Sequence, residues 1–167
     1  EVQYKKVATG RIQMLTNHLN GTKPLTDNLF LSFLTEDIDT TSGFATYFRY
    51  DSYRLDVLEK TAEEFGRLFS AGPVNDKIKA LFAKVIMEPK VWNGKRFFFL
   101  DALDKAFPHH AGFAMDCLLD LSEGIKKNKI HLGKEIFEKL AAHIAGILIS
   151  YNDTLSDDQK QRALKVL

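Results

Sequence analysis

The sequence is poor in the residues that build disulfide scaffolds and cysteine-based metal sites. Cys117 is its only cysteine, which excludes an internal disulfide and a zinc site made from several cysteines. A lone thiol fits a reducing compartment, so we expect an intracellular, cytoplasmic protein. No stretch approaches the roughly 20 apolar residues that cross a bilayer, and the N-terminal residues lack the charged-then-apolar pattern of a signal peptide.

The sequence also lacks an excess of either charge. Its 23 lysine and arginine residues stand against 22 aspartate and glutamate residues, which gives a formal net charge of +1. Such a balance creates no field over the whole surface that would attract nucleic acid or anionic membranes. Any binding of that kind must come from a local patch.

Motifs of the common enzyme classes are absent as well. No serine lies in a glycine-rich nucleophile elbow, and no glycine-rich loop matches a phosphate-binding pattern. The five histidines have no partner at the spacing of a helical metal site. Cys117 falls on a predicted apolar face, where a thiol is usually inert. We therefore predict a protein that is not an enzyme and holds no cofactor or metal.

Apolar residues are plentiful, and they follow the period of an amphipathic helix. The clearest run spans residues 44–69 at alternating steps of four and three, with Asp51 in one slot: Phe44, Phe48, Leu55, Leu58, Ala62, Phe65 and Phe69. This spacing predicts a long helix with one buried stripe. With 45% apolar residues in 167, including thirteen phenylalanines, the chain has the material for the core of one domain.

Similar patterns predict helices along most of the chain. They cover about residues 4–19, 24–37, 44–70, 76–88, 95–107, 109–127, 133–151 and 156–167. Asn75 is a predicted N-cap, and Ser156 with Gln159 forms a predicted capping box. Pro108 is expected to end one helix. Because no useful segment alternates with period two, we predict an all-α fold.

The predicted helices beyond residue 75 form antiparallel pairs with a period of roughly 35 to 40 residues, near the range of helical-pair repeats. We therefore expect a single all-helical domain, residues 1–167, of seven to eight amphipathic helices. It is either a short α-solenoid-like (HEAT-like) block of stacked pairs or an irregular helical bundle. The first residue is not methionine and the last residues still follow a helical pattern, so we expect a fragment or processed form of a longer chain.

Basic residues surround the single tryptophan. Trp92 lies between Lys90 on one side and Lys95 and Arg96 on the other, and three phenylalanines follow. An exposed tryptophan among basic groups can anchor an acidic peptide, whereas burial of the phenylalanines is ordinary packing. We predict Trp92 as a binding residue.

A second basic cluster crosses an expected turn near residue 130. Lysines at a helix C-terminus also stabilise its dipole, which explains Lys126 and Lys127 without a function. If this turn and the Trp92 connector share one edge of the stacked pairs, they form one positive binding edge. The predicted partner-binding residues are Trp92, Lys90, Lys95, Arg96, Lys126, Lys127, Lys129 and Lys134.

Carboxylates gather on one predicted helix at Asp116, Asp120 and Glu123, and Asp101 and Asp104 lie on the preceding one. Neighbouring helices could bring them together around a hard cation such as Mg²⁺ or Ca²⁺. Acidic residues beside an apolar stripe more often form a solvated helix face, which is the interpretation we favour.

The leading functional hypothesis is a scaffold or adaptor domain of a larger intracellular protein, which binds a partner peptide or helix at the basic and aromatic edge. Two alternatives stay open. One is a helical bundle around an apolar ligand such as a lipid, suggested by the many phenylalanines. The other is RNA binding through the same basic edge.

Overall fold

The computed structural model describes residues 2–36, 47–92 and 97–167, and the side chains of residues 5–36, 53–92 and 97–167. These residues form seven α-helices and two short 3-10 helices, and they contain no strand, so the all-α prediction is confirmed. The α-helices are α1 (Val2–Leu19), α2 (Asp27–Thr35), α3 (Tyr47–Ser70), α4 (Asp76–Ile86), α5 (Phe98–Lys126), α6 (Lys134–Ser150) and α7 (Asp157–Val166). The 3-10 helices are η1 (Pro89–Trp92) and η2 (Asn152–Thr154). None of the described helices is long and apolar enough to cross a membrane.

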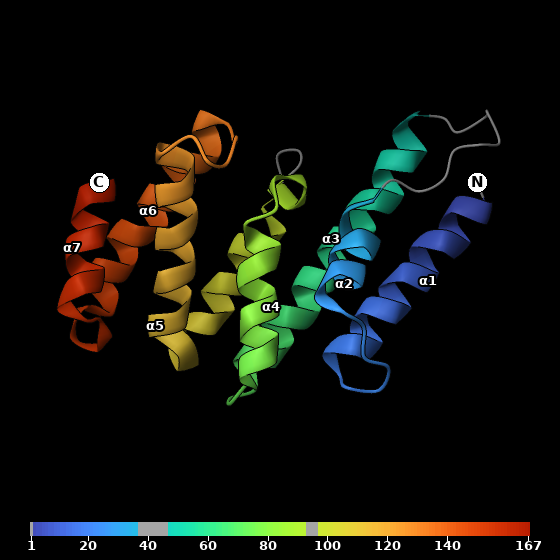
Figure 1. Cartoon of the computed structure of the whole chain (residues 1–167), viewed down its shortest axis with the longest axis horizontal. Helices are drawn as coiled ribbons and strands as arrows, with labels where there is room; N and C mark the ends of the chain where they lie inside the picture. The colour runs from blue at the N-terminus through green and yellow to red at the C-terminus, as the bar shows by residue number, and fades with distance from the viewer. Residues whose placement is uncertain (1, 37–46, 93–96) are drawn as a thin grey trace.

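The helices stack in chain order, with the two ends of the chain at opposite ends of the stack (Figure 1). One layer contains α1, α3, the first half of α5 and α6, each in contact with the next. The other contains α2, α4, the second half of α5 and α7. An ion pair of 2.6 Å between Lys84 of α4 and Asp27 of α2 links two of its members. This order of contacts is that of a solenoid-like block of antiparallel helical pairs.

Helix α5 belongs to both layers because it is sharply kinked. His110 has non-helical backbone angles (φ −138°, ψ 43°), and Pro108 just before it cannot donate the helical hydrogen bond to the carbonyl of Asp104. The His110 Nε2–H donates to the carbonyl of Gly72 at 2.7 Å, which fixes the bend against the α3–α4 connector. The predicted break therefore falls two residues after Pro108, and residues 98–109 and 111–126 form one helical pair.

Local capping signals set several helix boundaries. The Asn75 side chain accepts a hydrogen bond from the Ile78 N–H at 3.0 Å, and Ser156 and Gln159 form a reciprocal capping box. Both predicted caps are confirmed. Helix α2 begins later than predicted, at Asp27, because the hydroxyl of Thr26 rather than Pro24 supplies the N-cap. The predicted start of α3 at Phe44 lies outside the described residues.

Phenylalanine rings join the two layers in the core. Phe65 of α3 is fully buried, and its ring centroid lies 6.0 Å from that of Phe30, 5.0 Å from Phe82 and 6.5 Å from Phe99. These rings come from α2, α4 and α5. Because large aromatic side chains remove much apolar surface from water, this cluster holds four helices in place.

We expect Phe65→Ala to lower the free energy of unfolding by about 3–5 kcal/mol, since it leaves a cavity among four helices. Urea unfolding followed by circular dichroism measures this. Ile149→Ala is the control, because the Ile149 side chain is 85% exposed and its loss should change stability by less than about 0.5 kcal/mol. Equal losses in the two variants would contradict the central position of Phe65.

His143 joins α6 to the first half of α5. Its Nε2 lies 3.2 Å from a carboxylate oxygen of Asp104, and its Nδ1 lies 3.0 Å from the carbonyl oxygen of Lys139. Both of these partners accept hydrogen bonds, so both ring nitrogens are satisfied only in the protonated ring. The hydrogen bond to Asp104 is the main reason that the pKa of His143 is raised.

Because the pKa of His143 is raised in the folded state, the protonated ring stabilises the fold. This contribution is complete below the unfolded pKa of about 6.5, and it is lost as the pH rises through the folded pKa. We expect His143→Gln to remove this part of the pH dependence. Unfolding free energies measured across neutral and mildly alkaline pH test it, with exposed His131→Gln as the control. An unchanged pH profile in His143→Gln would exclude the interaction as a source of stability.

Candidate functional site

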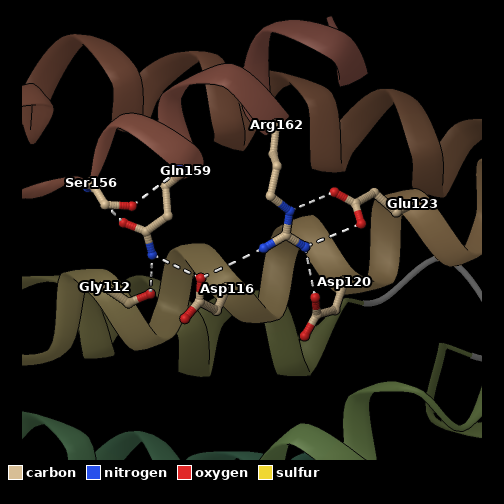
Figure 2. A network of polar contacts seen from close by, with 7 residues as sticks. All are labelled: Gly112, Asp116, Asp120, Glu123, Ser156, Gln159 and Arg162. Carbon is tan, nitrogen blue, oxygen red and sulfur yellow. Dashed lines mark hydrogen bonds and ion pairs between the residues drawn. The ribbon is translucent and has the colours of Figure 1, made fainter.

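Helix α7 is held along the second half of α5 by Arg162 (Figure 2). Its guanidinium lies 2.7 Å from Glu123, 2.8 Å from Asp120 and 3.9 Å from Asp116, measured between nitrogen and carboxylate oxygen. The three carboxylates recur at steps of four and three along α5, so they share one side of the helix and one arginine reaches all of them.

These acidic residues are the ones that the sequence offers as a candidate cation site. The structure places the Arg162 guanidinium among them, where its charge and its N–H groups satisfy the carboxylates. Asp104 of the other layer faces His143 instead. The side chains of Asp116 and Asp120 are still 53% and 59% exposed, so the predicted solvated face agrees with their positions, and Arg162 of α7 adds ion pairs to it. Within the described ranges no group of three or more His, Cys, Asp and Glu side chains is arranged to hold a metal ion.

Gln159 fixes the first turn of α7 against the kink of α5. Its side-chain amide donates to the carbonyl of Gly112 at 3.0 Å and to Asp116 at 2.8 Å, and its oxygen accepts the backbone N–H of Ser156 at 3.0 Å. The residue is only 8% exposed. A buried side-chain amide needs hydrogen-bond partners for both its oxygen and its nitrogen. Because these partners lie on α5 and at the start of α7, the bonds fix the first turn of α7 against α5.

The hydrogen bond from Arg162 is the main cause of the lowered pKa of Glu123, and the positive charges of Lys127 and Lys165 lower it further. The same bond raises the pKa of Arg162. On the buried side of this segment, burial is the main cause of the raised pKa of the Cys117 thiol, with Asp120 and Asp116 adding to it. Cys117 is 3% exposed and stays a protonated thiol, as its predicted packing role requires.

A hollow of about 450 Å³ lies beyond Arg162, toward the C-terminal ends of α5 and α7. We call it the α5–α7 hollow, and its walls are formed by Glu123, Lys126, Lys127, Arg162, Lys165 and Val166. The Lys126 ammonium donates to the backbone carbonyl of Lys165 at 2.8 Å, which holds its side chain across the two helix ends. Four basic side chains against one acidic side chain make this a positively charged concave surface.

The hollow lies at the edge of the stack where α4 leads into η1 and where α5 leads into the connector to α6 (Figure 1). Three segments with exposed lysines end at or near this edge. We call these lysines the basic edge, and they are Lys90, Lys126, Lys127, Lys129, Lys134 and Lys165. That the two predicted basic clusters form one binding edge stays a prediction. The sequence signals only the capping box of the last helix, and neither Arg162 nor Lys165 stands out in it as a site residue.

Trp92 is not at the surface. It is 4% exposed, and its indole N–H donates to the carbonyl of Ile86 at 2.8 Å. The 3-10 turn folds back on the end of α4, so the ring enters the core and its one polar group finds a backbone partner. The prediction that Trp92 is an exposed anchor is wrong. Lys95 and Arg96 lie outside the described residues.

No known protein family matches the chain, and neither does any solved structure. One curated protein, the ATP-dependent RNA helicase DBP9 of Gibberella zeae, is 28% identical over 134 residues. The match covers 76% of this chain and 20% of the helicase, so the chain spans about a fifth of the length of the relative it matches. A similarity of this extent does not assign the chain to the helicase family.

The lowered pKa of Glu123 implies that its pairing with Arg162 stabilises the fold above the unfolded pKa of about 4.3, and that this contribution is lost as pH falls through the folded pKa. We expect Glu123→Gln to weaken the acid dependence of stability and to lower stability at neutral pH by up to about 1 kcal/mol. Unfolding titrations at neutral and acidic pH measure both effects.

Glu138→Gln is the matched control, because Glu138 forms only an exposed pair of 3.7 Å with Lys134. Its acid dependence should equal that of the unmodified chain. The same weakening in both variants would show that the Arg162 contacts do not stabilise α7.

Proposed function

We propose that the chain is an interaction module that binds an acidic segment of a partner protein along its basic edge, without catalysing a reaction. The observation that carries this proposal is the α5–α7 hollow, whose walls contain Lys126 and Lys127 from the end of α5 and Lys165 from the end of α7. Complementary charge across an interface speeds association and selects partners, so a positive edge on a nearly neutral protein favours an acidic partner.

The ammonium groups of several of these lysines can contact a ligand directly. Among the described residues, no salt bridge or side-chain hydrogen bond engages the ammonium groups of Lys127, Lys129 or Lys165. Like charges held close together repel one another, and an acidic ligand relieves that repulsion. Lys126 and Arg162 are already held in place by intramolecular bonds, which reduces the side-chain entropy that binding costs.

The buried position of Trp92 changes the expected character of the interaction. Without an aromatic anchor, the contact relies on charge and on the shape of the hollow rather than on one large apolar side chain. Interactions of this kind are screened by salt, and mutations in them act strongly on the association rate. The proposed interaction is therefore weakened by salt.

RNA binding through the same basic edge is the second candidate, and the similarity to an RNA helicase favours it. Lysines that contact phosphates release counterions, so RNA affinity would fall steeply and linearly with salt on logarithmic axes. The apolar-ligand alternative gains no comparable support from the α5–α7 hollow, because five of its six wall residues are charged.

We expect the triple variant Lys127→Glu/Lys129→Glu/Lys165→Glu to bind a fluorescent aspartate-rich and glutamate-rich peptide at least about tenfold more weakly than the unmodified chain does. Fluorescence anisotropy at two salt concentrations measures the affinity, and thermal unfolding confirms that the variant is folded. The control is Lys5→Glu/Lys6→Glu/Lys77→Glu, which makes the same charge change at exposed lysines of α1 and α4.

The control should bind like the unmodified chain. Equal weakening in both variants would mean that only net charge matters, and it would contradict a site at the basic edge. A short oligouridylate that binds where the peptide does not would favour the RNA candidate.

A further inference from the structure

We infer that the α5–α7 hollow recognises a phosphoryl group on the partner segment, an inference that rests on the proposed function. The hollow is concave, and its volume of about 450 Å³ lies in the range of small-ligand sites. Lysine side chains line it from both walls, Lys126 and Lys127 from the end of α5 and Lys165 from the last turn of α7.

The cations that are available in the hollow are suited to a phosphoryl group. The planar fork of an arginine recognises both carboxylate and phosphate. The one arginine in the hollow, Arg162, already directs its Nε and Nη2 at Glu123, and its Nη2 also at Asp120. The cations that remain are the three lysines, whose compact ammonium groups bind phosphate as point charges.

The number of charges and donors fits a phosphoryl group. Phosphoserine carries a charge of about −1.5 to −2 at neutral pH and three acceptor oxygens, so one group can take a hydrogen bond from each of three ammonium groups. Lys126 uses one of its three N–H donors on the carbonyl of Lys165 and retains two. A carboxylate, with one charge and two oxygens, offsets less of the charge in these walls.

Glu123 does not oppose the ligand as an unpaired carboxylate would. Its Oε1 lies 2.7 Å from Arg162 Nε and its Oε2 lies 3.1 Å from Arg162 Nη2, so both oxygens face the guanidinium. Figure 2 shows this carboxylate turned toward Arg162, with Asp120 at the same guanidinium nitrogen, Nη2. The ion pair and the lysines all belong to the walls of the hollow.

A phosphorylated protein segment fits this geometry better than an RNA strand does. Single-stranded RNA is bound along an extended groove, with bases stacked on exposed aromatic rings. The aromatic side chain expected for that role, Trp92, is buried. The site therefore suits one terminal phosphoryl group rather than a run of bridging phosphates.

The test compares three short glycine and serine peptides that differ at one central position, which is phosphoserine, glutamate or serine. Each is titrated into the ¹⁵N-labelled full chain at constant ionic strength, and inorganic phosphate is titrated in parallel. We expect the phosphoserine peptide to bind about tenfold tighter than the glutamate peptide and to shift the amides of residues 126–129 and 165–167. Inorganic phosphate should shift the same amides at higher concentrations.

Lys127→Gln/Lys165→Gln should remove the preference for phosphoserine, while Lys5→Gln/Lys6→Gln should keep it. Equal affinity for the phosphoserine and glutamate peptides would overturn the inference, and the proposed function would stand if the acidic peptide still requires the basic edge. A preference unchanged in Lys127→Gln/Lys165→Gln would overturn the site. Binding of inorganic phosphate or of an oligouridylate at these amides without binding of the phosphoserine peptide would overturn the assignment to a partner protein.

Discussion

Contacts between aromatic rings at Phe65 fix the two layers relative to one another, and the rest of the stack is built outward from them. Helix α3 supplies Phe65 and Phe69, and rings of α2, α4 and both halves of α5 pack on this pair. Every other helix contacts a helix of this cluster: α1 contacts α2 and α3, and α6 and α7 contact α5. The centre of the molecule is therefore apolar and closely packed, and the distinctive polar chemistry lies toward the C-terminal end.

The polar contacts of α7 fix its packing and, with it, the shape of the proposed binding site. Gln159 and Arg162 hold α7 on α5, and in doing so they bring Lys165 beside the end of α5. Without these contacts, Lys126, Lys127 and Lys165 would be ordinary solvated side chains on two separate helix ends. The basic hollow is thus a product of helix packing. Glu123 and Asp120 pair with Arg162, and among the described side chains the three lysines form no ion pair with either carboxylate.

Local signals in the sequence were sufficient to predict the helices. The caps at Asn75 and Ser156 each involve a residue three positions further along the chain. The buried stripe of α3 follows the regular steps of three and four residues in the sequence. The site depended on contacts between distant segments. Arg162 meets carboxylates about forty positions earlier in the chain, and nothing in its immediate neighbours signals this. The position of Trp92 in a connector predicts exposure, and this prediction is wrong. The 3-10 turn brings the indole N–H to the backbone carbonyl of Ile86, so the ring can be buried with its one polar group satisfied.

The bend at His110 determines how the stack can change shape. Elsewhere a connector of several residues joins the two members of a helical pair, so small adjustments are shared among many backbone torsions. In α5 the two members follow one another through a single non-helical residue. The turn between these two members therefore depends on the torsions of one residue, whose ring is tethered to the Gly72 carbonyl. A change of the angle between the two halves of α5 must pass through this residue, and it must also disturb the packing of Phe113 on Phe69 and Phe82.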